Sequence, residues 1–378
     1  MNFEGKVTID LSRGDDSAVR VEYRQPVEID RILRGKAPQD VPAMLAMVYS
    51  VCGNAQAHAS ALALEAASGE ASDPVTSRSR TILTALETWR ETALRIVLEW
   101  PGMTGGEADT ATAREVMALL PRMKQALFAN TAPFAIGATA VPDIHAALKI
   151  VGEVEKLTGE HVLGESCERF LARRGHEGLS DWAVSRSTQA AEFMRHLLTH
   201  GWMDEAWVDA PALDLPDRAD KMSRWFALAV AGRGGEAGTV PETTPYSRRR
   251  NDPNIASLAS HGIGVRFAAR LTELARLPLE MHDLLARKVR PTVVSASIDG
   301  YGTAIVEAAR GLLVHVVRLE KGAVADYRVI APTDWNFHSR GIAAQCLDAL
   351  GDHADRDTLA HLVVRAIDPC VAYEMRAG

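Results

Sequence analysis

Long hydrophobic runs are missing from this sequence of 378 residues. Its most apolar stretch, residues 126–142, is interrupted by Asn130, Thr131 and Pro133. No run therefore reaches the roughly 18 residues that would indicate a membrane-spanning helix. The opening residues, Met1–Gly5, have neither the basic region nor the apolar region of a secretory signal. We expect a protein that is neither secreted nor embedded in a membrane.

Cysteine is also scarce, with four residues in the whole chain, and there is no excess of basic residues. So few cysteines do not make a disulfide framework, so we expect reduced thiols in a cytoplasmic protein. The net charge of −7 argues against a nucleic-acid binder, because such a protein normally carries a basic patch. The short Arg248–Arg250 run is interpreted as a solvated loop. The sequence shows neither an internal repeat nor a nucleophile–base–acid arrangement.

What the sequence does contain is hydrophobic periodicity, in a chain long enough to bury a sizeable core. Helical patterns cover residues 38–49, 55–67, 81–100, 111–129, 143–157, 185–199, 264–288 and 355–365. Alternating patterns predict strands over residues 7–11, 19–23, 303–307, 312–319 and 327–330. Turns are expected at Arg13–Asp16, which makes the first two strands a hairpin, and at Lys321–Ala323. Residues 209–220 and 232–253 are rich in Pro, Gly, Asp and Arg and are predicted to be loops.

These patterns predict an α+β fold that is predominantly helical, with small sheets contributed by both ends of the chain. We expect one large domain made of three consecutive parts. They are an N-terminal β-hairpin (residues 1–35), a helical core (36–290) and a C-terminal segment of strands and a helix (291–378).

The cysteines fall into two kinds. Cys52 lies between two predicted helices, close to the N-terminus of the second, where the helix dipole favours thiolate over thiol. Cys370 lies just after the last predicted helix. Cys167 and Cys346 lie in no recognisable motif and are interpreted as structural.

Histidine patterns are weaker. His196 and His200 stand four residues apart on a predicted helix, a spacing that could bind a metal. The glutamate of the H-E-x-x-H motif is absent, so we interpret the pair as structural. His58 follows Cys52 closely, and its role is left open.

The segment around Cys52 resembles a metal-binding motif of the large subunit of nickel–iron hydrogenases. Val48–Gln56 is similar to the family pattern I-C-G-x-C-x-x-x-(H/Q). Cys52 matches the second cysteine, which bridges nickel and iron in that family, and Gln56 matches the last position. Tyr49 replaces the first cysteine, which is a terminal nickel ligand.

The segment around Cys370 resembles the second metal-binding motif of the same family. Val364–Arg376 is similar to R-x-(F/I)-D-P-C-x-x-C-x-x-H. Cys370 matches the first, terminal cysteine, while Tyr373 replaces the second, bridging one, and Arg376 replaces the histidine. The sequence ends soon after this motif, so we expect no C-terminal extension of the kind that a maturation protease removes from hydrogenase precursors.

Four further segments resemble the family in the same order along the chain. They are Glu4–Ile9 (E-G-H-x-x-I), Pro241–Arg248 (faintly E-T-G-x-x-A-R), Glu307–Gly311 (E-A-P-R-G) and Ala331–Asn336 (V-P-(S/T)-x-W-N). In the family, the glutamate of the first lies on a proton path, and the arginine of the third lies over the cyanide ligands of the iron. The last segment lines the same pocket. The resemblance thus implies that Arg310, Pro332 and Thr333 line a pocket for the ligands of an iron atom, and that Glu4 lies on a proton path.

The loss of one cysteine from each motif is similar to the pattern of a narrower group, the HupK/HoxV hydrogenase expression and formation proteins. The resemblance implies a scaffold rather than an enzyme. It would hold an Fe(CN)2(CO) unit transiently through Cys52 and Cys370 while a hydrogenase is assembled. Nickel is not expected, because in the family it is held by four thiolates. The implied partners are a HypC/HypD-type iron-delivery complex and a hydrogenase large-subunit precursor, with no nucleic acid and no membrane.

Two other functions remain open. A diverged hydrogenase or hydrogen sensor that binds both metals is opposed by the missing cysteines. A purely structural large-subunit homologue, like the hydrogenase-derived subunit of respiratory complex I, is opposed by the retention of Cys52 and Cys370. The coordination is open too, because iron contacts only bridging cysteines in the enzyme and Cys370 matches a terminal one. Either Cys370 turns toward the iron, or iron binds through Cys52 alone.

Overall fold

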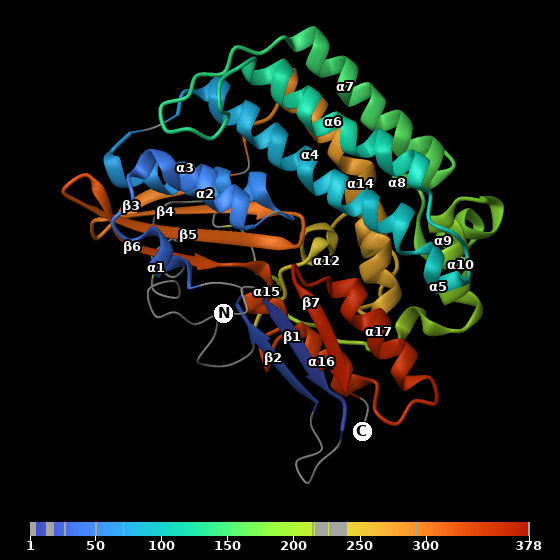
Figure 1. Cartoon of the computed structure of the whole chain (residues 1–378). Coiled ribbons are helices and arrows are strands. Elements are labelled where there is room, and N and C mark those ends of the chain that lie inside the picture. The colour runs from blue at the N-terminus through green and yellow to red at the C-terminus, as the bar shows by residue number, and fades with distance from the viewer. Residues whose placement is uncertain are drawn as a thin grey trace.

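The computed structural model describes residues 5–12, 19–25, 28–49, 51–70, 72–213, 215, 226, 240–291 and 293–376. Four long helices run side by side and form the body of this part of the molecule (Figure 1). They are α4 (Pro74–Leu98), α6 (Thr110–Phe128), α7 (Ile144–Leu157) and α14 (Ile263–Leu285). Large apolar side chains on their facing sides, such as Leu86, Trp89 and Leu271, are completely buried.

Aspartate side chains define where three of these helices begin. Asp73, Asp109 and Asp143 each accept hydrogen bonds from backbone N–H groups in the first turn of α4, α6 and α7. Such caps satisfy donors that have no partner inside the helix. The cap at Asp73, with Pro74 next to it, explains why α4 begins earlier than the predicted residue 81. Helix α4 ends near the predicted Trp100, and a short helix α5 (Pro101–Thr104) follows.

Shorter helices surround this bundle. They are α8 (Cys167–Leu171), α9 (Gly175–Ser185), α10 (Gln189–Thr199), α12 (Pro245–Arg249) and α13 (Pro253–Ala256), with 3₁₀ turns at Pro38–Asp40 and Trp202–Asp204 and a π-helical turn at Thr158–Leu163. The loop predicted over 232–253 is wrong where α12 forms and at the start of α13. There Thr244 and Ser247 form a reciprocal capping box. Residues 214, 216–220 and 232–239 of the predicted loops lie outside the described residues.

Four antiparallel strands form one sheet in chain order. They are β3 (Val293–Ile298), β4 (Tyr301–Ala308), β5 (Gly311–Glu320) and β6 (Ala323–Ile330). Helix α3 (Gly53–Ser68) lies across β4 and β5, and α2 (Val41–Val48) and α1 (Ile29–Leu33) pack nearby (Figure 1). The approach of α3 is close enough that a Cβ on Gly302 would lie 1.9 Å from the carbonyl oxygen of Ala63. The three strands predicted here are confirmed, and β3 is additional.

A second sheet joins the two ends of the described chain. Its order is β2 (Arg20–Arg24), β1 (Lys6–Asp10) and β7 (Ala372–Arg376). Strands β1 and β2 are antiparallel, which confirms the predicted strand pair, while the predicted turn at 13–16 lies outside the described residues. Strand β7 was not predicted and runs parallel to β1, with Val7 opposite Tyr373.

Three helices lead from the first sheet to the second. They are α15 (Pro332–Asn336), α16 (Ile342–Ala349) and α17 (Arg356–Ile367), the last of which matches the predicted helix 355–365. The expected α+β architecture with predominant helix is confirmed, whereas the division into three parts stays a prediction. None of the described helices combines the length and the apolar character needed to cross a membrane.

Candidate metal site

The structure brings the two motif cysteines into one neighbourhood. Cys52 is the residue from which α3 begins, and Cys370 lies between the end of α17 and the start of β7. Both are free thiols and partly buried. They are close enough that a charge on Cys370 raises the pKa of Cys52. The two halves of the motif pattern therefore contribute to a single site.

The thiol of Cys52 does not have the thiolate character that its position at a helix N-terminus predicts. Burial raises its pKa well above the ordinary range, and the nearby Glu87 carboxylate adds to this effect. Glu87 of α4 accepts hydrogen bonds from the backbone N–H groups of Asn54 and Ala55, each at 2.9 Å, and from the Asn54 side chain at 2.7 Å. A carboxylate from another helix thus accepts hydrogen bonds from the first amide donors of α3, and its negative charge opposes a thiolate on the neighbouring sulfur.

Cys370 is held against α15 by Thr333. The hydroxyl oxygen of Thr333 lies 3.0 Å from the sulfur of Cys370 and accepts a hydrogen bond from the Cys370 backbone N–H at 3.3 Å. Burial raises the pKa of the Cys370 thiol, although Thr333 and the positive charge of Arg310 act in the opposite direction. Pro332 starts α15, where a residue without an N–H group is tolerated, and so places Thr333 in the first turn.

Arg310 is a buried cation with unused hydrogen-bond donors. Its residue surface is 3% exposed, and none of its three side-chain nitrogens has a hydrogen-bond partner among the described residues. Its Nε lies 3.1 Å from Oδ2 of Asp368, in an ion pair that does not meet hydrogen-bond geometry. Burial alone would lower the pKa of Arg310, but the nearby groups, Asp368 first and then Cys370, Glu91 and Cys52, outweigh it and raise the pKa. The guanidinium therefore stays charged.

Asp368 forms ion pairs with three arginines. The sequence did not indicate it as a functional residue. Besides Arg310, it contacts Arg95 of α4 at 3.2 Å and Arg270 of α14 at 3.4 Å. Burial would raise the pKa of Asp368, but the three arginines outweigh it and hold the pKa below its ordinary value. Glu99 also pairs with Arg95 beside the same cavity, so two carboxylates face the three guanidinium groups.

A cavity of about 480 Å³ opens beside Cys370 and Asp368. Arg95, Arg270 and Tyr373 also line it. The hydroxyl of Tyr373, which replaces the second cysteine of its motif, lies 3.0 Å from Nδ1 of His361.

Tyr49, which replaces the other missing cysteine, stands at the site as a neutral phenol. Burial raises its pKa beyond the ordinary range, and so do the nearby carboxylate of Asp334 and the two thiols. Tyr23 of β2 has the same neighbours and the same direction of shift. These phenols occupy the space around the cysteines without adding a charge.

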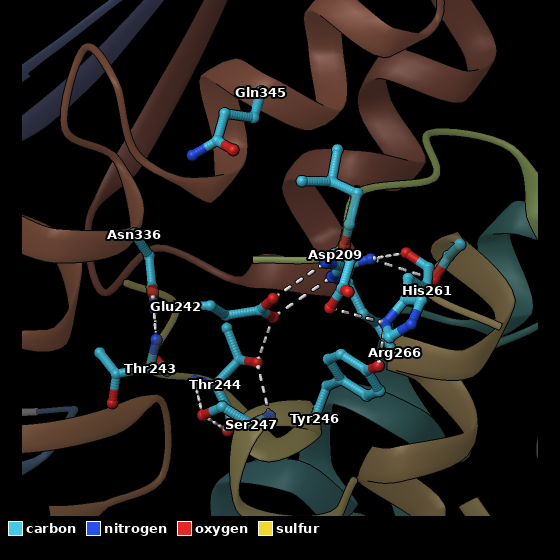
Figure 2. Close-up of polar contacts among 12 residues, drawn as sticks. Asp209, Glu242, Thr243, Thr244, Tyr246, Ser247, His261, Arg266, Asn336 and Gln345 are labelled. Atoms are coloured by element: carbon cyan, nitrogen blue, oxygen red, sulfur yellow. Dashed lines mark hydrogen bonds and ion pairs between the residues drawn. The ribbon is translucent and has the colours of Figure 1, made fainter. Parts of the chain in front are cut away.

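Two of the segments that resemble the hydrogenase family, Pro241–Arg248 and Ala331–Asn336, contact each other. Figure 2 shows the pair formed by Thr243 and Asn336: the Thr243 N–H donates to the Asn336 side-chain oxygen at 3.0 Å, and the Asn336 amide donates back to the Thr243 carbonyl at 2.6 Å. The Thr243 hydroxyl also accepts a hydrogen bond from the Leu312 N–H at 2.8 Å. The loop that carries Arg310 is thus fixed by residues from two other segments of the chain.

Arg248 also holds the loop that carries Arg310. The interpretation of the Arg248–Arg250 run as a solvated loop is therefore wrong. The Arg248 guanidinium forms two hydrogen bonds to Glu273, at 2.7 and 2.9 Å, and donates to the carbonyls of Ala308 and Ala309. Arg249 pairs with Glu280. These arginines hold α12 against α14 and against the strand end that precedes Arg310.

The remaining candidates lie elsewhere. Cys167 and Cys346 are buried in the main hydrophobic core, as their structural interpretation requires. The rings of His196 and His200 contact each other and Trp202 in tilted or edge-on arrangements, and Glu4 lies outside the described residues. Within the described part of the chain, no group of three or more His, Cys, Asp or Glu side chains is arranged to hold a metal ion.

Comparison with known proteins gives concordant matches. Residues 270–374 match a family model described as nickel-dependent hydrogenase. The hydrogenase expression/formation protein HoxV of Cupriavidus necator is 30% identical over 379 residues, covering 92% of this chain and 90% of that protein. The corresponding protein HupK of Bradyrhizobium diazoefficiens is 28% identical, covering 98% and 95%.

Among solved structures, the reduced, active Ni-Fe-Se hydrogenase of Desulfomicrobium baculatum superimposes with a TM-score of 0.64 at 15% identity, over 93% of each chain. The expected hydrogenase-like fold is therefore confirmed.

Proposed function

Because this chain belongs to the family of hydrogenase expression/formation proteins that includes HoxV and HupK, we propose that it is a scaffold on which the iron unit of a hydrogenase is held during assembly. The cargo would be an iron atom that carries two cyanides and one carbon monoxide. The observation that carries this proposal is Arg310, a buried charged side chain with unused donors beside two thiols.

Unused donors on a buried guanidinium are rare and indicate a ligand that the protein itself does not supply. Metal-bound cyanides carry negative charge and accept hydrogen bonds, and a guanidinium is a rigid donor of several such bonds. The guanidinium groups of Arg270 and Arg310, which share Asp368 as a carboxylate partner, favour an anionic cargo in the same way. Thr333, next to Cys370, offers one more hydroxyl.

The donor set suits an iron that brings ligands of its own. Such an iron has about three positions left for protein groups, and thiolates suit metals of this kind. Cys52 and Cys370 could fill two positions, or Cys52 could bind alone. Nickel in the enzyme family is held by four thiolates, and Tyr49 and Tyr373 stand where two of these would be, so we propose that nickel is not part of the cargo.

The proposal includes two partners and no catalytic turnover. A HypC/HypD-type complex would deliver the iron unit, and a hydrogenase large-subunit precursor would receive it. The cavity of about 480 Å³ beside Cys370 offers the cargo a way in and out without opening of the helical bundle.

Infrared spectroscopy tests this proposal directly. The full-length protein is purified without oxygen from cells that contain a complete hydrogenase maturation system, and iron and nickel are measured in the same sample. We expect carbonyl and cyanide bands and sub-stoichiometric iron in the wild type and no bands in Cys52→Ser. Cys346→Ser, which removes a buried thiol outside the site, serves as the matched control and should keep the bands.

Wild-type protein without carbonyl and cyanide bands would contradict the scaffold. Stoichiometric nickel beside the iron would instead favour a diverged hydrogenase or hydrogen sensor.

A further inference from the structure

A chain of three buried polar side chains runs from Cys52 into the interior. Gln56, one helical turn after Cys52 on α3, has its side-chain nitrogen 3.8 Å from the Cys52 sulfur. The Gln56 oxygen lies 2.8 Å from Nε2 of His315 on β5, and Nδ1 of His315 lies 2.7 Å from the hydroxyl of Tyr327 on β6. Gln56 is 1% exposed, and the other two are completely buried.

The chemistry of the three side chains determines which group donates and which accepts at each hydrogen bond. Burial lowers the pKa of His315 to about 3, so the ring is neutral at physiological pH and carries a single N–H. An amide oxygen can only accept a hydrogen bond, so this hydrogen belongs on Nε2, where it points at Gln56. Nδ1 must then accept from the hydroxyl of Tyr327, which burial keeps protonated by raising its pKa.

We propose that His315 and Tyr327 are positioning residues, which hold the amide of Gln56 so that its NH2 group donates to the sulfur of Cys52 when that sulfur binds iron. This inference rests on the proposed scaffold function and deepens it. Groups that orient a ligand or bond to it tune the metal, and an N–H donor draws electron density from a thiolate. Gln56 would therefore make the bound iron less electron-rich.

The reversed amide gives a distinct alternative. If Gln56 turned over, its oxygen would face Cys52 and its NH2 group would face His315, which would then carry its hydrogen on Nδ1 and donate it to Tyr327. That arrangement accepts a hydrogen bond from a protonated thiol, whereas a metal-bound sulfur has no hydrogen to donate. The position of one hydrogen on His315 therefore distinguishes the two.

The first experiment measures this tautomer in the full-length protein both without cargo and carrying the iron unit. Long-range proton–nitrogen correlation spectra of protein labelled with nitrogen-15 histidine report which ring nitrogen is protonated, and His315→Phe assigns the signal. We expect the Nε2–H form in the wild type and a mixture in Tyr327→Phe. Tyr246→Phe, which breaks a separate tyrosine–histidine contact of 2.6 Å to His261, should leave the His315 signal unchanged. The Nδ1–H form in protein that carries the iron unit would overturn the inference, because a metal-bound sulfur has no hydrogen to donate to the Gln56 oxygen.

The second experiment records the carbonyl band of protein carrying the iron unit. Gln56→Leu removes the donor, so the band should move to lower wavenumber as the iron becomes more electron-rich. His315→Phe should move it in the same direction although Gln56 is still present, and Tyr246→Phe should not move it. If His315→Phe does not fold, Tyr327→Phe replaces it in this comparison.

Unmoved bands in both variants, with iron retained, would show that Gln56 does not act on the iron ligand. Absence of bands from the wild type would count against the scaffold function itself. The tautomer measurement would still decide how Gln56 is oriented.

Discussion

At the scale of single residues, Arg310 differs from the other buried arginines because it is paired in charge but not in hydrogen bonds. Arg80, Arg266 and Arg270 each donate to carboxylates or carbonyls around them. Within the described part of the chain, Arg310 has only the ion pair with Asp368. Its donors are therefore available to a ligand, and its loss should affect binding more than folding.

We expect Arg310→Leu to lower retention of the iron unit about ten- to a hundredfold, since a charge-assisted hydrogen bond contributes about 1.5–3 kcal/mol. The free energy of unfolding should change little, because Asp368 keeps its contacts with Arg95 and Arg270. Iron content, carbonyl band intensity and a thermal melt are measured on the same preparation.

Arg270→Leu is the matched control for this prediction. It removes two hydrogen bonds from Arg270 to the Ala366 carbonyl, at 3.1 and 2.9 Å, and should destabilise the fold more than Arg310→Leu. Equal iron occupancy in the wild type and Arg310→Leu would identify Arg310 as a structural residue.

The raised pKa values of Cys52 and Cys370 predict that uptake of the iron unit depends on pH. A thiol whose pKa is raised holds its proton at neutral pH, and that proton must leave before the sulfur can bind metal. Affinity should therefore rise with pH while the pH is below the thiol pKa. The rise is about tenfold per pH unit for each thiol that binds.

The slope of this dependence also answers how many cysteines bind. A plot of log affinity against pH should have a slope of about two if both sulfurs bind and about one if Cys52 binds alone. Cys370→Ser should lower the slope only in the first case. A flat profile between pH 6 and 9 would contradict thiol ligation altogether.

Sequence patterns located both cysteines but not their chemistry. The thiolate expected at Cys52 follows from the start of α3, and that helix does begin there. The pKa is instead decided by burial and by Glu87, whose carboxylate comes from a different helix and has no local signal. Arg270 and Asp368 illustrate the same limit, because their pairing joins residues almost a hundred positions apart.

At the scale of elements, the turn between β4 and β5 is the part on which the site depends most. Gly311 has φ +139°, and a Cβ there would lie 2.2 Å from the carbonyl oxygen of Thr243. The turn therefore requires glycine for both its backbone conformation and its close approach. This contact fixes Arg310, the preceding residue, relative to α12 and α15.

Gly311→Ala should lower the free energy of unfolding by about 2–6 kcal/mol, through backbone strain and a clash with backbone atoms. Gly322→Ala is the matched control, because Gly322 also has positive φ, +78°, yet no atom lies within 4 Å of the added Cβ. That variant should lose only about 1–2 kcal/mol. Denaturant unfolding measures the free energy of unfolding of both variants. Similar decreases would show that the backbone at Thr243 moves away from the added Cβ without loss of stability.

Elements with strong local periodicity were predictable, and elements that depend on distant partners were not. Helix α7 has buried apolar residues at helical spacing, such as Ala147, Ile150 and Val154, and matches the predicted residues 143–157. Helix α12 lies in a segment of loop-like composition and forms because of its capping box and the Arg248–Glu273 pair. Strand β7 has no alternating core of its own and exists because β1 lies beside it.

At the scale of the whole molecule, the chain keeps the hydrogenase fold while one thiol of each ligand pair is replaced by tyrosine. The motif resemblance is confirmed by the relatives, and their names support the proposed maturation role. The identity of the cargo, the cytoplasmic location and the two partners stay predictions. A fold shared with an enzyme does not carry the activity of that enzyme with it.

We expect no hydrogen oxidation or evolution by the purified protein, even after incubation with nickel, because two of the four thiolates are absent. Tyr49→Cys combined with Tyr373→Cys restores the complete set of sulfurs and should bind nickel more tightly than the wild type. Nickel affinity and gas turnover are measured on both proteins. Hydrogen turnover by the nickel-loaded wild type would overturn the scaffold assignment.

The parallel pairing of β7 with β1 has a consequence for the timing of biosynthesis. Cys370 and β7 are translated after every other described helix and strand, whereas β1 emerges first. Until β7 arrives, β1 and β2 form only a two-stranded ribbon, which is marginally stable in water. A nascent chain on the ribosome therefore lacks both the second sulfur and the strand that positions it. If the proposed iron unit binds through both sulfurs, it can be accepted only after translation has passed β7, and incomplete chains would then not capture a scarce and reactive metal unit.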